Sequence, residues 1–247
     1  MNKYELLQDD KIEVSGRTLY RIRALKDFKG AKAGDLGGYI EKEKNLSQED
    51  NCWVSGNARV FGEAYVCGNA RVFGEAYVCG NARVCGDAYV YDNARVSGNA
   101  RVCGDAYVYG NARVCGDAYV YDNARVSGDA CVYGNACVCD NARVCGDAYV
   151  YDNARVCGDA KINKISDVLC VSPIGSRNDV TTFFKTKDNN IGVKCGYFAG
   201  TIDDFLEAVN ETHGENKHAK AYKLACELAR VQIESEDVRN ERNIIQR

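Results

Sequence analysis

The chain has 247 residues, with 32 lysines and arginines against 35 aspartates and glutamates, so its formal net charge is −3. This balance gives no global attraction to nucleic acid or to anionic lipid. No apolar run approaches the about 18 residues that a membrane helix needs, and the first residues lack the apolar core of a signal peptide. We therefore expect a cytoplasmic protein that does not bind membranes.

Residues 1–50 are expected to form an N-terminal cap. The alternating apolar residues of segment 11–20, with Ser15 and Gly16 between its two halves, predict a β-hairpin. The glycine-rich segment 34–40 then leads into the central part of the chain.

A six-residue repeat dominates the sequence from Asn51 to Lys164. These 114 residues divide into 19 units of six, such as NARVFG, EAYVCG and DAYVYD. Within a unit, Ala-x-Val alternates like a short strand, with Ala and Val on one face and Arg or Tyr on the other. The Gly-Asn, Gly-Asp or Asp-Asn pair between units consists of turn residues. Three such units close a triangular coil of about 18 residues, and stacked coils pair as parallel strands about 4.8 Å apart.

The repeat places a small residue four positions after an aliphatic one, as in Val60 and Ala64. This pattern resembles the hexapeptide-repeat family of left-handed β-helices. The predicted fold is therefore mainly β: a left-handed parallel β-helix of about six triangular coils over residues 51–170, with an N-terminal β cap and a C-terminal α/β cap.

The flanks carry a second resemblance. Segments 20–28 and 33–41 are similar to bacterial and prophage hexapeptide-repeat proteins, and segments 175–179 and 211–218 are similar to phage-encoded relatives labelled as transferases or polymer-forming proteins. The resemblance implies a phage or prophage origin and the cytosol of a bacterial host.

The repeat stops near Pro173, the only proline, and residues 171–247 predict a C-terminal α/β domain. Segments 181–185 and 191–195 are expected strands. Thr201 begins a capping-box sequence, which predicts a helix up to about residue 212. A second helix is expected from about residue 217 to 235. Its apolar face, of the kind that packs against a core, comprises Ala221, Leu224, Leu228 and Val231.

Most of the 14 cysteines occupy repeat positions that Tyr, Phe, Ser or Arg fill in other units, so we expect free thiols rather than disulfides. With 18-residue coils, one outer column comprises Cys67, Cys85, Cys103, Tyr121, Cys139 and Cys157. Such a column is either a soft-metal ladder or, as we favour, a small residue stacked on itself. The Cys137-Val138-Cys139 spacing is too short for a zinc-binding pair, so no metal is expected.

The resemblance implies acyl transfer by a histidine between coils, or a metal held by three histidines. Both histidines of this chain, His213 and His218, lie outside the coils. No Walker loop, dinucleotide-binding glycine pattern or HExxH motif is present, so we expect no cofactor. We therefore predict a protein without enzymatic activity, with an acyl- or other group transferase acting at the C-terminal cap as the alternative.

Two groups of residues are candidate binding sites. A Gly-Ser-Arg turn and two histidines near the helix junction suit a small ligand such as a nucleotide. This group comprises Ser176, Arg177, Asp179, His213, Asn216, Lys217 and His218. Outward Tyr and Arg side chains of the coils suit a protein partner or self-association into a homo-oligomer. This group comprises Tyr89, Arg101, Tyr107, Arg113 and Tyr119.

Carboxylates at the coil corners balance the arginines, so nucleic acid is not an expected partner. The predicted function is that of a rigid binding or scaffolding protein. A rival within the same class is an inhibitor of a host defence factor, which acts by binding either a protein or a nucleotide signal.

Overall fold

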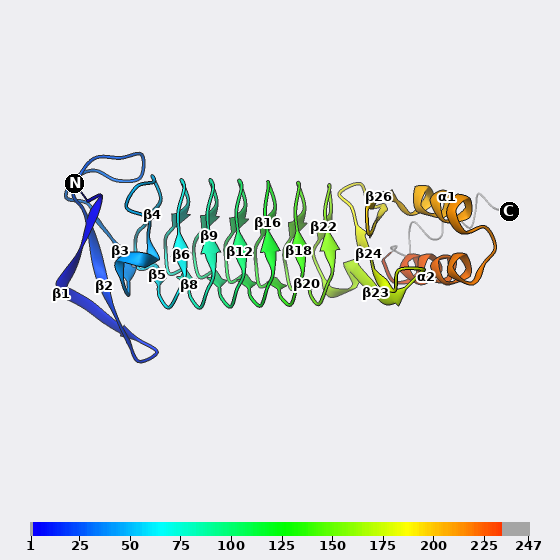
Figure 1. The fold of residues 1–247 in the computed structure, drawn as a ribbon, viewed down its shortest axis with the longest axis horizontal. Helices are drawn as coiled ribbons and strands as arrows, with labels where there is room; N and C mark the ends of the chain where they lie inside the picture. The colour runs from blue at the N-terminus through cyan, green and yellow to red at the C-terminus, as the bar shows by residue number, and fades with distance from the viewer. Residues whose placement is uncertain (1, 234–247) are drawn as a thin grey trace.

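The computed structural model describes residues 2–233, and Figure 1 shows a rod with a different cap at each end. The rod is a parallel β-solenoid of about seven turns, which confirms the predicted mainly β fold of stacked coils. The first turn begins before the repeat, because β3 (Leu36–Ile40) pairs in parallel with β5 (Arg59–Val60), and Leu46 forms a bridge with Val66. The repeat alone therefore underestimates the number of turns.

The N-terminal cap is the predicted hairpin, made of β1 (Tyr4–Val14) and β2 (Arg17–Ala24) around Ser15 and Gly16, which both have positive φ. Strand β2 also pairs with β3, so the cap extends one sheet of the rod. Beneath it, Trp53 is 3% exposed, with its ring 5.3 Å from that of Phe28. The cap thus closes one end of the hydrophobic core.

Two-residue strands form the three sheets of the rod. The first continues from β3 through β5, β8 (Tyr77–Val78), β11 (Arg95–Val96), β14 (Arg113–Val114), β17 (Cys131–Val132) and β20 (Tyr149–Val150). The second contains β4 (Trp53–Val54), β7 (Arg71–Val72), β10 (Tyr89–Val90), β13 (Tyr107–Val108), β16 (Arg125–Val126), β19 (Arg143–Val144) and β22 (Lys161–Ile162). The third contains β6 (Tyr65–Val66), β9 (Arg83–Val84), β12 (Arg101–Val102), β15 (Tyr119–Val120), β18 (Cys137–Val138) and β21 (Arg155–Val156).

The interior of the rod is filled by the valine and alanine of the repeat units, with Cys52 at the alanine position of the first unit and Ile162 at the valine position of the last. Val90, Val108 and Val126 stack in register on consecutive coils, and each is 0% exposed. The corners need positive φ, which explains the repeated glycine. At Gly104, with φ of 67°, an added Cβ would lie 2.8 Å from the backbone nitrogen of Asp122 in the next coil. The turn residue is therefore limited both by its backbone conformation and by the spacing of the coils.

An antiparallel sheet caps the other end of the rod. It comprises β23 (Val168–Ile174), β24 (Asp179–Lys185), β25 (Ile191–Cys195) and β26 (Phe198–Thr201), and it includes both predicted strand segments. The backbone nitrogen of Arg155 donates to Thr182 Oγ1 (3.0 Å), and Lys187 pairs with Asp159 (2.8 Å). These contacts fix the sheet against the last coils.

Helices α1 (Ile202–His213) and α2 (Lys217–Ile233) pack on this sheet. The predicted cap of α1 is confirmed, because Thr201 Oγ1 accepts a hydrogen bond from the backbone nitrogen of Asp204 (3.2 Å). Short 3-10 turns, Glu43–Asn45 and Ile165–Asp167, lie at the two ends of the coils. No helix within residues 2–233 is long and apolar enough to cross a membrane.

The face that α2 presents to the sheet differs from the predicted one. Leu224 is 65% exposed and Leu228 is 52% exposed. The buried face instead comprises Ala219, Tyr222, Ala225, Cys226, Ala229 and Ile233. This set also recurs at three- and four-residue spacing, and its small residues let the helix backbone approach the sheet closely. Leu224 and Leu228 therefore face outward.

Candidate functional site

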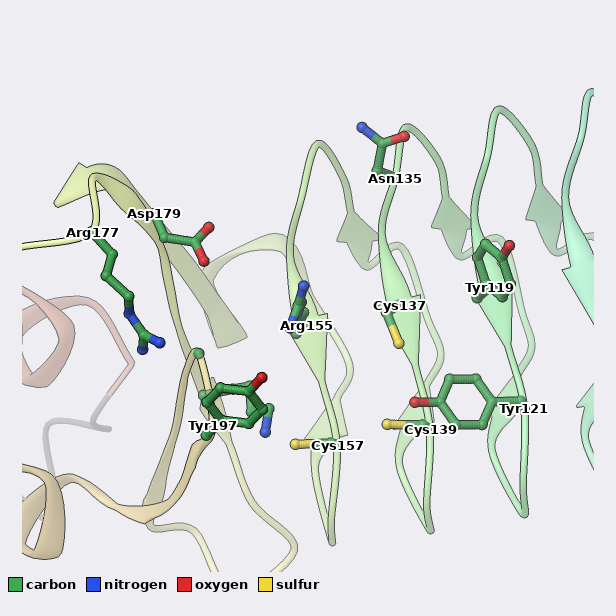
Figure 2. Close-up of a pocket in the computed structure, with 12 residues that line it drawn as sticks. Tyr119, Tyr121, Asn135, Cys137, Cys139, Arg155, Cys157, Arg177, Asp179 and Tyr197 are labelled. Atoms are coloured by element: carbon green, nitrogen blue, oxygen red, sulfur yellow. The ribbon is translucent and has the colours of Figure 1, made fainter.

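A groove with a volume of about 860 Å³ lies where the last coils meet the C-terminal sheet (Figure 2). One wall comes from the coils and comprises Tyr119, Tyr121, Asn135, Cys137, Cys139, Arg155 and Cys157. The other comes from the C-terminal domain and comprises Arg177, Asp179, Lys194, Gly196 and Tyr197. The groove is thus a product of both parts of the chain.

Coil stacking places the residues of the first wall. The ladder of β15, β18 and β21 aligns Tyr119, Cys137 and Arg155 in one column. One step outside each strand, Tyr121, Cys139 and Cys157 form the neighbouring column, and Figure 2 shows their polar ends in a row. Residues two positions apart in the chain, such as Tyr119 and Tyr121, point to the same side, so the two columns line the groove next to each other.

Three thiols meet at the centre of this wall. Cys137 and Cys157, as hydrogen-bond donors, hold the pKa of the Cys139 thiol well below its usual range, helped by the Tyr121 hydroxyl and the charge of Lys194. Its hydrogen bond to Cys139 and its burial raise the pKa of Cys157. Cys139 is 9% exposed. A lowered pKa increases the thiolate fraction of a cysteine, and the thiolate is its nucleophilic form.

The charge of the groove favours an anionic ligand. Arg155, Arg177 and Lys194 line it together with a single carboxylate, that of Asp179. None of these three cations forms an ion pair with another residue of segment 2–233. Their charges therefore remain available to a ligand, although the chain as a whole is slightly acidic.

The structure distributes the predicted ligand-binding residues over three places. Arg177 and Asp179 line the groove. Ser176 and His213 line a smaller pocket beside it, which Arg177 shares. Asn216 caps α2, because its Oδ1 accepts from the backbone nitrogens of His218 (2.8 Å) and Ala219 (3.1 Å).

The two histidines lie together at the helix junction. Their ring centroids are 5.8 Å apart, and Lys217 is an exposed residue at the start of α2. A role of these residues in ligand binding remains a prediction, as does that of the residues in the groove.

The predicted protein-contact residues do not share one sheet. Tyr89 and Tyr107 stack in the second sheet, with ring centroids 5.0 Å apart. Arg101 lies over Tyr119 in the third sheet, at 5.2 Å, and Arg113 belongs to the first. Because consecutive units turn a corner, residues close in sequence point to different sides of the rod. A protein contact through them remains a prediction.

All 14 cysteines are unpaired thiols, and the column predicted from the 18-residue period is present. Within residues 2–233 no cluster of three His, Cys, Asp or Glu side chains is arranged to hold a metal ion. Sequence reasoning noted the Cys137 and Cys139 pair only as a poor zinc motif. It missed Lys194 and Tyr197, because only the folded C-terminal domain places them opposite these thiols.

Two comparisons with known proteins bear on function. A family model described as the YdcK beta solenoid repeat matches residues 88–104, 100–116 and 118–134, all within the coils. A protein of Escherichia coli (strain K12), named "Uncharacterized acetyltransferase YdcK", is 47% identical over 47 residues. That match covers 19% of this chain and 14% of the relative. Both matches support a β-helix of the repeat type.

The prediction of a protein without enzymatic activity is wrong in the light of the second match. The relative is named an acetyltransferase, which points toward group transfer. The prediction relied on the missing coil histidines, which both catalytic arrangements implied by the resemblance require, and it kept a transferase at the C-terminal cap only as the alternative.

Proposed function

We propose that the chain is an acyl-group transferase that uses the groove between the last coils and the C-terminal sheet, with Cys139 as its nucleophile. One observation carries the proposal: Cys139, beside the thiols of Cys137 and Cys157, lines a groove together with three cations that form no ion pair within residues 2–233. The similarity to a protein named an acetyltransferase supports the choice of an acyl group.

The cations indicate what kind of donor the groove binds. Arg155 comes from the coils, whereas Arg177 and Lys194 come from the C-terminal domain. Arginine pairs with phosphate or carboxylate through two parallel hydrogen bonds, and lysine acts as a point charge. An acyl thioester with an anionic carrier therefore fits the groove, with its carrier on the cations and its carbonyl near Cys139.

The reaction takes place in two steps. The Cys139 thiolate attacks the thioester carbonyl, an S–C bond forms to Cys139, and the carrier leaves with the electron pair of the broken C–S bond as a thiolate. The amine or hydroxyl of an acceptor then attacks the acyl-cysteine carbonyl. The acyl–sulfur bond breaks, its electron pair returns to Cys139, and the proton of the acceptor passes to solvent. In this route the lowered pKa of Cys139, rather than a coil histidine, activates the nucleophile.

Release of free carrier thiol from acetyl-CoA by the full chain, followed with and without amine acceptors, tests the proposal. We expect Cys139→Ser to abolish the release. Cys85→Ser is the matched control, because the pKa of Cys85 is also lowered by hydrogen bonds from two thiols, those of Cys103 and Cys67, but Cys85 does not line the groove. Equal loss in both variants, or no release by the unaltered chain, contradicts the proposal.

The predicted phage origin, the homo-oligomer and the inhibition of a host defence factor remain separate predictions. Purification of the chain from its own host tests the last of them, since a co-purifying host protein or nucleotide supports it. A chain that is free of both contradicts it.

A further inference from the structure

A second pocket lies behind the groove, between the C-terminal sheet and the two helices. Its volume is about 220 Å³, below the about 300–1,000 Å³ of sites for drug-sized ligands. Arg177 lines both the groove and this pocket. A site of this size is suited to a ligand built on a single ring.

Aromatic side chains make up much of its wall. The ring of Phe205 lies 5.1 Å from that of Phe198 and 5.3 Å from that of Tyr222, in an edge-on arrangement with Tyr222. The His213 ring is 5.9 Å from the Tyr222 ring, at an interplanar angle of 30°. These contacts hold the rings in fixed orientations, so a planar apolar group meets a preformed surface.

The polar groups of the pocket favour a negative charge on the ligand. The guanidinium of Arg177 is its one permanent charge, and no carboxylate is among the lining residues. Arg177 lies over Gly196, a residue of the groove, where an added Cβ would be 2.0 Å from Nη2, so the guanidinium lies at the boundary between the groove and this pocket. Ser176 and Thr212 add hydroxyl groups. A carboxylate therefore has charge-assisted donors within the pocket.

We infer that this pocket binds a small aromatic carboxylate, with its ring among Phe198, Phe205 and Tyr222 and its carboxylate on Arg177. The site is separate from Cys139. Binding therefore does not depend on the proposed acyl transfer, and either proposal can fail alone.

Titration of the full chain with benzoate, followed by isothermal calorimetry and by ligand-observed NMR, tests the inference. We expect saturable binding of benzoate and at least tenfold weaker binding of benzyl alcohol, which keeps the ring but not the charge. Arg177→Met should weaken benzoate binding at least tenfold and remove the preference between the two probes. Cys139→Ser should leave benzoate binding unchanged.

Filling the pocket provides a second test. Ala208 lines the pocket from α1, and Ala208→Phe should abolish binding, whereas Glu207→Phe, on the exposed side of the same helix, should not. If Ala208→Phe fails to fold, Thr212→Phe fills the pocket from a solvent-exposed position. Unchanged binding in a folded filling variant overturns the inference. So does the absence of saturable binding, or inorganic phosphate binding as tightly as benzoate.

Discussion

Replacement of Val108 by alanine in the middle of the rod tests whether the coils fold as one unit. Val108 is 0% exposed and stacks between Val90 and Val126. The change removes two methyl groups, each contributing about 0.8 kcal/mol of burial. The cavity left behind, on the order of 40 Å³, adds about 1 kcal/mol. We therefore expect the free energy of unfolding to fall by about 2–3 kcal/mol.

The assay is urea unfolding followed by two signals. Circular dichroism reports on the whole rod, and the fluorescence of Trp53, the only tryptophan, reports on its N-terminal end. Trp53 belongs to β4, three strands from β13 in the second sheet, which is about 14 Å at the usual strand spacing. If stacking is cooperative, both midpoints shift equally, although the alteration is remote from Trp53.

Two controls define the result that refutes this reasoning. Arg113→Ala alters an exposed side chain and should change the free energy of unfolding by less than about 0.5 kcal/mol. Val108→Asp places a charge in the core without a partner and should unfold the middle coils. A cost of Val108→Ala no larger than that of Arg113→Ala, or a midpoint shift seen by circular dichroism but not by Trp53, contradicts a cooperative valine core.

Three further predictions concern other parts of the chain. In denaturant unfolding, Leu224→Gln should change the free energy of unfolding by less than about 0.5 kcal/mol, because Leu224 is exposed, whereas Ala229→Leu should cost about 1–3 kcal/mol through overpacking; the reverse order would refute the buried face of α2. Gly104→Ala should lower the melting temperature more than Gly158→Ala, since both have positive φ but only Gly104 meets the next coil; equal effects would contradict the coil spacing. Burial raises the pKa of the Cys226 thiol to about 12, above its unfolded value near 9, so the unfolded chain loses this proton first and stability should fall as pH rises through that window. The loss, measured by melting temperature, should be smaller in Cys226→Ala, and an unchanged pH dependence would argue against a buried thiol.

The rod could be predicted from the sequence because each of its elements is local and repeated. The alternation in Ala-x-Val defines the inward face, and the glycine or aspartate at each corner defines the turn, so one unit predicts all others. The first turn escaped this reasoning, since β3 and Leu46 pair with the coils without sharing their pattern. The geometry of the first turn depends on strand pairing with residues about 20 positions later in the chain.

The face of α2 and the groove could not be predicted in the same way. Helix α2 carries two stripes with helical spacing, one of small residues and one of leucines, and periodicity alone does not decide which is buried. Which of the two stripes is buried depends on how closely the sheet approaches the backbone of the helix. Likewise, Lys194 and Tyr197 reach the thiol wall only because contacts such as that of Arg155 with Thr182 dock the sheet on the last coils.

Site-resolved mass spectrometry after brief incubation with acetyl-CoA tests the proposed acyl transfer most directly. The full chain contains its own control, because Cys85 and Cys139 each have two neighbouring thiols that lower their pKa, while only Cys139 faces the cationic groove. We predict that the acetyl group appears on Cys139 and not on Cys85, and that it disappears when an acceptor is added. Acetylation of both cysteines to the same extent, or of neither, would contradict a transferase site in the groove.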